Sequence, residues 1–297
     1  MNSVAFIGLG NMGAGMAANL ARSGRDVRAF DISQVALAGA RASGCGVASS
    51  AAEAVRGAGV VITMLPAAAQ VQEVWREAVI PNASPDALLI DCSTIDVESA
   101  RRIAEEANLA GFRAADAPVS GGVAGAEAGT LAFMVGCATT VFGEIETTLA
   151  PMARTVIHAG DSGAGQAAKI CNNMLLGITM IGACEAFTLA ERLGLDPERF
   201  FDIASKSSGQ CWSLTSYCPW PGPVPAAPSN RGYEGGFPTA LMSKDLKLAQ
   251  QAAAKVGVAT PLGAQAQAIY ALFETLGYGH KDFSALMQLL RGRLGDL

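Results

Sequence analysis

The sequence has few residues of the types on which many enzymes depend. Its 297 residues include only two histidines, His158 and His280, which leaves little for a histidine-based metal site or for a Ser-His or Cys-His mechanism. The seven cysteines are scattered and form no Cys-x-x-Cys pair, so we expect reduced cysteines in the core. Neither a metal centre nor a disulfide framework is therefore expected.

Charge is also scarce, and it is balanced. Charged residues make up 16% of the chain, and 21 Lys and Arg against 26 Asp and Glu give a net charge of −5. A mildly acidic protein lacks the basic surface that neutralises phosphates, so nucleic acid is not an expected partner. The 51% of hydrophobic residues excludes general disorder, and the length suits one large domain or two ordinary ones.

Long hydrophobic runs are missing as well. The longest, Met174–Cys184, is well short of the ~20 residues that a membrane-spanning helix needs, so we expect a buried helix there and no membrane partner. Met1–Leu9 does not combine a basic start with a long apolar stretch. No targeting signal is expected, and the protein is expected to be cytoplasmic.

Glycine, in contrast, is abundant, with 34 residues, and the first half of the chain alternates short apolar runs with helical periodicity. This alternation predicts a parallel sheet with helices on both faces. The expected strands are Val4–Ile7, Val27–Phe30, Val60–Leu65, Ala87–Ile90 and Ala114–Val119. The expected helices among them are Asn11–Arg22 and Ile95–Ala110, with Asp96 in the first turn of the second.

The pattern becomes helical near Gly160–Gly165. A long helix is expected over Gly165–Arg192, and Asp196-Pro197 is typical of the N-cap and first position of the next one. The remaining expectations are a packed loop over Ser207–Pro238 and helices over Leu241–Val256, over Leu262–Leu276 and after Asp282. We predict a Rossmann-type doubly wound α/β domain over residues 1–163. An all-helical substrate and oligomerisation domain follows over 164–297, joined by the long helix.

A nucleotide-binding pattern lies at the start of the chain. Gly8-Leu9-Gly10-Asn11-Met12-Gly13 has the G-x-G-x-x-G spacing directly after an expected strand and before an expected helix. In such a turn Gly8 makes the tight bend, Gly10 lets the backbone approach a pyrophosphate, and Gly13 lets helix and strand pack closely. Asp31 ends the next strand, where a carboxylate binds ribose hydroxyls and repels a 2′-phosphate. NAD is therefore expected in preference to NADP.

Residues at the ends of two further strands complete the expected cofactor site. Ligands of open parallel sheets bind beyond the carboxyl ends of the strands, so Leu65 and Pro66 are expected on the adenine–ribose side. Ser93 or Thr94 is expected to face the nicotinamide. One of these two hydroxyls can equally cap the helix that follows, and both roles can hold together.

A second glycine-rich segment, Asp116–Gly122, follows the last expected strand of the first half. Successive N–H groups in such a turn form a nest that binds anions, and Ser120 adds a hydroxyl donor. Ser120, Gly121 and Gly122 are therefore expected to bind a small carboxylate. A flexible crossover loop is the alternative.

A third glycine-rich segment leads into the long apolar helix and carries a lysine. Lys169 and Asn173 are four residues apart and so share one helix face. An amine in apolar surroundings is costly unless it is paired or functional, and burial favours its neutral form, which suits proton transfer. Lys169 and Asn173 are thus expected to be catalytic, and Asn173 is also expected to hold a substrate oxygen. A lysine that reaches the surface is the alternative.

Two further lysines, Lys244 and Lys247, lie at the start of a later expected helix. Lys247 is typical of a solvated helix face, whereas Lys244 is expected in the first turn of its helix, where a cation is unfavourable. Lys244 is therefore the expected cofactor ligand of the two.

Together these segments resemble the β-hydroxyacid dehydrogenase family over the whole chain. The resemblance rests on Gly8–Gly13, on Asp116–Gly122, on the glycine motif that ends in Lys169 and Asn173, and on Lys244-Asp245-Leu246. It implies an NAD-dependent oxidoreductase that takes a hydride from a small β-hydroxy acid while Lys169 accepts the hydroxyl proton. It also implies a homodimer or homotetramer.

Within the family, Lys169–Leu176, Gly209–Ser213 and Gly235–Leu246 are most similar to the branch that oxidises 3-hydroxyisobutyrate in valine breakdown. This similarity implies the substrate, and we expect Trp212 and Phe237 to close the pocket over its methyl group.

Two departures separate the chain from other relatives. Leu176 stands where decarboxylating 6-phosphogluconate relatives carry an acid, and Lys169 is replaced in imine-reducing and in non-catalytic chromatin-associated relatives. The remaining alternatives are a tartronate-semialdehyde or glyoxylate-type reductase of the same family and an NAD-binding protein without turnover.

Overall fold

The computed structural model describes residues 3–297, and the chain divides between Lys169 and Ile170 into two compact units. Met1 and Asn2, the first residues of the segment considered for a targeting signal, lie outside the described residues. Each unit is described by itself below.

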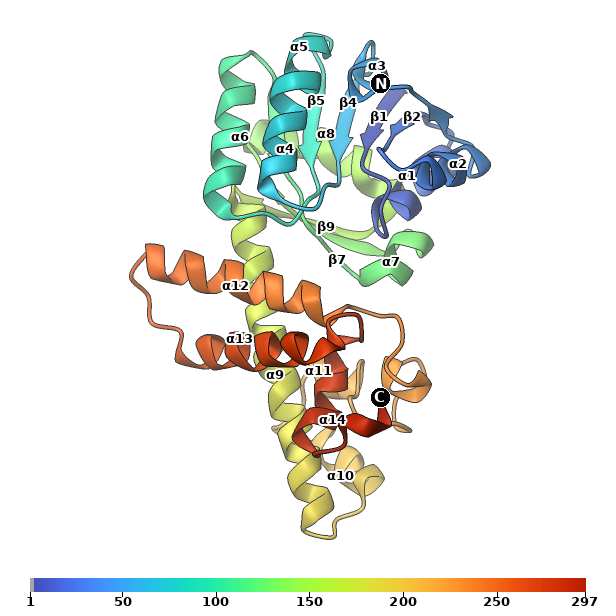
Figure 1. Ribbon diagram of the computed structural model, residues 1–297. Coiled ribbons are helices and arrows are strands. Elements are labelled where there is room, and N and C mark those ends of the chain that lie inside the picture. The colour runs from blue at the N-terminus through green and yellow to red at the C-terminus, as the bar shows by residue number, and fades with distance from the viewer. Residues whose placement is uncertain (1–2) are drawn as a thin grey trace. The chain divides into compact units, whose positions relative to one another are not determined.

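The first unit is built on one twisted sheet (Figure 1). Its strands are β1 (Ser3–Ile7), β2 (Asp26–Phe30), β3 (Gly46–Val47), β4 (Val60–Thr63), β5 (Leu88–Asp91), β6 (Arg113–Asp116), β7 (Val119–Ser120), β8 (Leu131–Gly136) and β9 (Ala153–Gly160). They lie in the order β3-β2-β1-β4-β5-β6-β8-β7, and β9 pairs with β8. The parallel run from β3 to β6 has the 3-2-1-4-5-6 order of dinucleotide-binding folds, which confirms the predicted Rossmann-type class.

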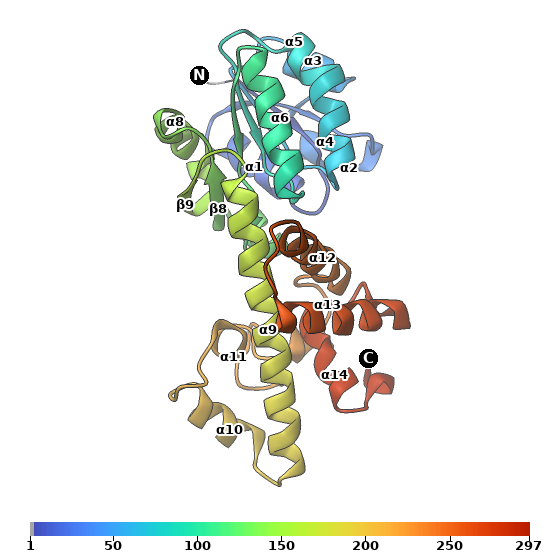
Figure 2. The same cartoon turned by 90° about the vertical axis from the view of Figure 1, so that its left-hand side faces the viewer.

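Helices cover both faces of this sheet because successive residues of each strand point to opposite sides. Phe6 packs among residues of α1, α2 and α8, and the next residue, Ile7, packs among residues of α3, α4 and α6. Figure 2 shows α4 and α6 next to each other on one face. The helices are α1 (Gly13–Arg22), α2 (Gln34–Ala42), α3 (Ala51–Val55), α4 (Ala68–Val74), α5 (Ile80–Asn82), α6 (Val97–Leu109), α7 (Gly122–Ala128) and α8 (Thr139–Leu149).

The far edge of the sheet differs from the prediction. The single strand expected over Ala114–Val119 is two strands, β6 and β7, because Ala117-Pro118 interrupts the ladder and proline has no N–H to donate. Strand β8 then runs antiparallel to β6 and β7, whereas a purely parallel sheet was expected. Only a short segment joins β7 to β8, which suits antiparallel pairing.

The second unit is helical over its described residues, as predicted. It contains most of α9 (Ala164–Arg192), then α10 (Pro197–Ala204), α11 (Trp212–Thr215), α12 (Thr239–Lys255), α13 (Pro261–Phe273) and α14 (Leu286–Leu290). Asp196 caps α10, accepting a hydrogen bond from the Arg199 N–H at 3.0 Å, as its Asp-Pro sequence predicts. A Cβ on Gly177 would lie 3.2 Å from a Leu246 methyl carbon, so this glycine lets α9 and α12 pack closely.

Helix α9 is long and apolar over most of its surface. It is the one helix within residues 3–297 whose length and composition would let it cross a membrane, a test that core helices of globular proteins also pass. Met180 and Phe187 are buried, but Leu175 and Leu189 are 61% exposed. The expectation of a buried helix is therefore correct for one face only.

Candidate active site

The first glycine-rich turn lies between β1 and α1, as predicted, at the carboxyl end of the strand. Gly8 has a φ of +98°, and a Cβ there would lie 2.2 Å from the Met64 carbonyl oxygen. A Cβ on Gly13 would lie 2.0 Å from the Gly8 carbonyl oxygen, whereas a Cβ on Gly10 would meet nothing within 4 Å. The fold itself therefore requires Gly8 and Gly13, while Gly10 faces open space of the kind that a pyrophosphate needs.

Asp31, which follows β2, turns its carboxylate back toward this glycine turn. Its Oδ2 atom accepts a hydrogen bond from the Leu9 N–H at 2.6 Å, and its Oδ1 atom accepts one from the Ser33 N–H at 2.8 Å. These two backbone bonds fix the orientation of a half-buried carboxylate. The remaining lone pairs of its oxygens are suited to the two hydroxyls of a ribose.

The two hydroxyls predicted near the nicotinamide differ in their surroundings. The Ser93 hydroxyl is fully buried, donates to Asp91 Oδ1 at 2.6 Å and accepts from the Leu65 N–H at 2.8 Å. Ser93 therefore joins the ends of β4 and β5, and its hydroxyl has no further hydrogen to donate to a ligand. Thr94 is half-buried and Pro66 is exposed, so both remain candidates for the cofactor site.

The prediction that Ser93 or Thr94 caps the following helix is wrong. Helix α6 begins at Val97, two residues later than expected, and Asp96 is its N-cap. The Asp96 carboxylate accepts a hydrogen bond from the Ser99 N–H at 2.8 Å, so Asp96 also lies outside the first turn where it was expected.

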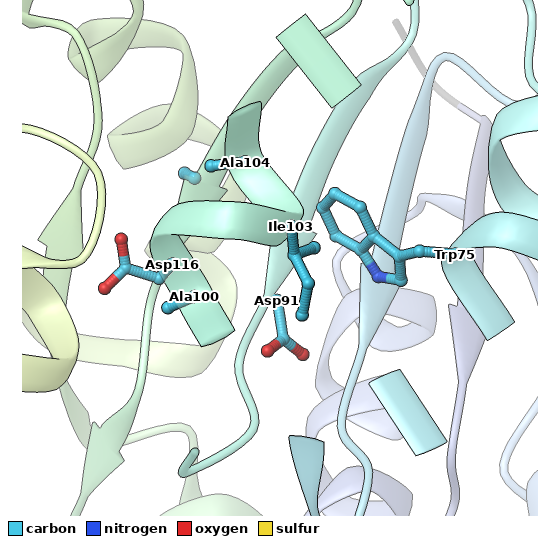
Figure 3. Close-up of a pocket in the computed structure, with 7 residues that line it drawn as sticks. Trp75, Asp91, Ala100, Ile103, Ala104 and Asp116 are labelled. Carbon is cyan, nitrogen blue, oxygen red and sulfur yellow. The ribbon is translucent and has the colours of Figure 1, made fainter. Parts of the chain in front are cut away.

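Two buried aspartates lie next to each other at the ends of β5 and β6. Asp91 and Asp116 are partners in the strand register, and Figure 3 shows them among the residues that line a cavity, with Trp75 on the side of Asp91. The cavity between them has a volume of about 10 Å³, enough for one water at most. Burial raises the pKa of Asp91 to about 6, against hydrogen bonds from Ser93 and Thr63 that lower it. This cavity is thus part of the core and no cofactor fits it.

The second glycine-rich segment forms the turn between β7 and α7. Gly121 and Gly122 have φ values of +136° and +64°, which side-chain-bearing residues rarely adopt. Ser120, at the end of β7, is half-buried. Glycines are therefore needed to form this turn, and carboxylate binding by it remains a prediction.

The third glycine-rich segment, which includes Gly163 and Gly165, allows the first turn of α9 to pack closely against the sheet. Asp116 accepts hydrogen bonds from the Gly163 N–H at 2.6 Å and from the Gln166 N–H at 2.8 Å. A Cβ on Gly165 would lie 2.3 Å from the Met134 carbonyl oxygen in β8. The carboxylate stabilises the N-terminus of α9, and the glycines remove the side chains that would hold the helix away.

Lys169 lies one turn further along α9 and is 6% exposed, so it does not reach the surface. Asn173 is 1% exposed; its Nδ2 atom donates to Asp245 Oδ2 at 2.5 Å, and its Oδ1 atom accepts from Asn172 Nδ2 at 3.0 Å. Asp245, buried in α12, is a functional candidate that the sequence prediction missed. Its signal was an acid on a helix face that also carries Met242, Leu246 and Ala249.

Lys244 lies elsewhere on its helix than expected. Helix α12 begins at Thr239, where the backbone N–H donates to the Lys281 carbonyl, so Lys244 is in the second turn and the first-turn argument is wrong. Lys244 is half-buried, and Lys247 is exposed as predicted.

The two predicted pocket aromatics are linked through a buried acid that the sequence prediction did not identify. Trp212, 52% exposed, stacks on Tyr217 with ring centroids 4.9 Å apart. Asp282 Oδ2 accepts from the Tyr217 hydroxyl at 2.7 Å and from the Phe237 N–H at 2.8 Å. A Cβ on Gly236 would lie 2.2 Å from the same Asp282 oxygen. Asp282, whose pKa burial raises, therefore fixes the segments that carry both aromatics.

Comparison with known proteins identifies the family of the chain. A family model described as the NAD binding domain of 6-phosphogluconate dehydrogenase matches residues 3–160, and one described as NAD-binding of NADP-dependent 3-hydroxyisobutyrate dehydrogenase matches residues 163–290. The solved 3-hydroxyisobutyrate dehydrogenase of Mycobacterium tuberculosis with L-serine is 49% identical, with a TM-score of 0.94 over 98% of this chain and 99% of its own. The chain belongs to the β-hydroxyacid dehydrogenase family.

Two curated members of the family come from Pseudomonas aeruginosa. Its 3-hydroxyisobutyrate dehydrogenase is 47% identical over 99% of this chain and 100% of its own length. Its NAD-dependent L-serine dehydrogenase is 45% identical over 97% of this chain and 98% of its own. The chain is thus an NAD-binding oxidoreductase of this family, and the predicted fold, cofactor and enzyme class are confirmed.

Proposed function

We propose that this enzyme oxidises 3-hydroxyisobutyrate to methylmalonate semialdehyde with NAD, as a step of valine degradation. The observation that carries the proposal is the pair of buried polar side chains, Lys169 and Asn173, on one face of an apolar helix that begins at the glycine motif. The names of the 3-hydroxyisobutyrate dehydrogenases to which the chain is similar support the substrate.

The proposed cofactor site follows from the first unit. The glycine turn binds the pyrophosphate, because Gly10 leaves open space and the N–H groups of α1 favour phosphate. Asp31 binds the ribose hydroxyls, and its charge repels the extra phosphate of NADP. The proposed contact residues are Gly8, Leu9, Gly10, Asn11, Met12, Gly13, Asp31, Leu65, Pro66, Thr94 and Lys244.

The proposed substrate site uses the other two glycine motifs. Ser120, Gly121 and Gly122 bind the carboxylate, and Asn173 holds the alcohol oxygen. When bound, NAD supplies the carbon that accepts the hydride. Lys169 accepts the hydroxyl proton as the carbon–hydrogen bond breaks, so that negative charge does not accumulate on the oxygen.

The side chain at the second carbon distinguishes the candidate substrates. 3-Hydroxyisobutyrate carries a methyl group where L-serine carries an ammonium group and glycerate a hydroxyl. Trp212 and Phe237 are proposed to contact this position, and an apolar contact disfavours a charged or polar group that it cannot pair. The L-serine dehydrogenase among the relatives makes L-serine the main competitor.

A substrate panel tests the proposal. The purified protein is assayed with 3-hydroxyisobutyrate, L-serine and glycerate, each with NAD and with NADP, and NADH or NADPH formation is followed by absorbance. We expect the highest kcat/KM for 3-hydroxyisobutyrate with NAD. A higher value for glycerate would favour the tartronate-semialdehyde or glyoxylate-type reductase, and NADH binding without turnover of any acid would favour a non-catalytic protein.

A further inference from the structure

The side chain of Gln166 ties the start of α9 to the loop between β5 and α6. It is fully buried, its Nε2 atom donates to the Ser93 carbonyl oxygen at 2.7 Å, and its Oε1 atom accepts from the Ile95 N–H at 3.2 Å. Both ends of one amide therefore satisfy backbone groups on either side of Thr94. An apolar residue here would leave a buried carbonyl and a buried N–H unpaired.

The same turn of α9 is held from a second direction. The Gln166 backbone N–H, together with that of Gly163, donates to the carboxylate of Asp116 at the end of β6. Ser93, whose carbonyl Gln166 binds, uses its hydroxyl to accept from the Leu65 N–H after β4. Gln166 is thus connected to the ends of three neighbouring strands, at the edge where doubly wound sheets bind dinucleotides.

We propose that Gln166 is a positioning residue that fixes the Lys169 amine relative to the Ser93–Ile95 loop, an inference that rests on the proposed function. Lys169 follows Gln166 by three residues and so lies on the same face of α9. Rotation or translation of the first turn would carry the amine with it. Because proton transfer needs the two atoms within hydrogen-bonding distance, a displacement of about 1 Å can lower the rate about 100-fold.

The substitution Gln166→Met tests the inference, since methionine has a similar length and helix propensity but offers neither hydrogen bond. We expect kcat to fall about 10- to 100-fold, with a smaller loss of NAD affinity, because Thr94 is only one of the proposed cofactor contacts. Gln265→Met is the matched control, because Gln265 is exposed in the middle of α13, and it should keep the parent kcat. An unchanged kcat in Gln166→Met would overturn the inference.

A double-mutant cycle with Lys169→Ala shows whether Gln166 acts through the amine. If it does, adding Gln166→Met to Lys169→Ala leaves the residual single-turnover rate unchanged. Equal fold losses in both backgrounds would mean that Gln166 acts independently of Lys169, and the inference would fail. A Lys169→Ala variant that keeps the parent kcat would instead contradict the proposed function.

Gln166→Glu provides a second variant if Gln166→Met folds poorly. A protonated carboxyl can accept from Ile95 and donate to Ser93, as the amide does, but an ionised one cannot donate. We therefore expect its kcat to approach the parent value at low pH and to fall below it as pH rises, with a larger solvent deuterium isotope effect on kcat. A ratio of parent to variant kcat that is constant with pH, with an unchanged isotope effect, would contradict the positioning role.

Discussion

At the scale of single residues, three buried acids hold backbone segments in place near the functional motifs. Asp91, Asp116 and Asp282 are each at most 3% exposed, and burial raises the pKa of all three. Their carboxylates accept hydrogen bonds from backbone N–H groups or hydroxyls at the ends of strands, at the start of α9 and beside Phe237. These acids position loops, and the proposed chemistry uses none of them directly.

Asp91 gives the clearest pH prediction, because its pKa rises from 3.8 to about 6 in the folded protein. A raised pKa means that the folded state binds the Asp91 proton more tightly than the unfolded state does. The contribution of protonated Asp91 to the free energy of unfolding is therefore complete below pH 3.8 and is lost as pH rises through about 6. As pH rises over this range, the free energy of unfolding of the parent protein should fall by up to roughly 3 kcal/mol more than that of the Asp91→Asn variant. Urea unfolding of both proteins across this pH range measures the difference. A difference that does not change with pH would contradict the assignment.

At the scale of elements, the glycines of the first turn have separable roles. Gly13 is required by the contact between α1 and the Gly8 carbonyl, whereas no atom of residues 3–297, its chain neighbours apart, lies within 4 Å of a Cβ on Gly10. The fold therefore requires one glycine of this six-residue motif, and the proposed cofactor contact requires another.

This separation predicts opposite phenotypes for two alanine substitutions. Gly13→Ala should lower the unfolding free energy by roughly 1–3 kcal/mol, because its methyl group overlaps backbone. Gly10→Ala should keep the parent stability without cofactor but weaken NAD binding about tenfold or more, because its methyl group takes the space of the pyrophosphate. Urea unfolding without cofactor and a fluorescence titration with NADH measure the two effects. Equal loss of stability in both variants would show that Gly10 is a structural glycine.

Sequence pattern predicted the elements that carry strong periodicity or a glycine motif. It predicted the central strands, α1, α6 and α9, and it predicted the α10 cap from Asp196-Pro197. It did not predict α2, α3, α4, α7 or α8, nor β8 and β9. In β9 the residues are exposed or half-buried, so the apolar run that marks a buried strand is absent.

The hydrogen-bonded pairs of the candidate site could be found only from the three-dimensional structure. Gln166 and Ser93 are 73 residues apart, and Asn173 and Asp245 are 72 apart, so nothing in the local pattern joins them. Lys169 could be singled out because an amine in an apolar helix is conspicuous in itself. Gln166 could not, because a glutamine among small residues has no such signal.

At the scale of the whole molecule, the chain combines a doubly wound dinucleotide-binding unit with a helical unit, and it matches relatives over their full lengths. The three glycine motifs all lie in the first unit, and the aromatic residues proposed to select the methyl group lie in the second. In the proposed site the first unit supplies the three glycine motifs and Lys169, and the second unit supplies Asn173, Lys244 and the two aromatic residues.

Acceptance of the substrate proton by the Lys169 amine is tested by the turnover of Lys169→Ala with 3-hydroxyisobutyrate and NAD. The control is Lys247→Ala, which removes an exposed lysine of α12. We expect kcat of Lys169→Ala to fall about 100- to 10,000-fold while NAD binding persists, and we expect the control to keep the parent kcat. A fall of less than about tenfold in Lys169→Ala would contradict it.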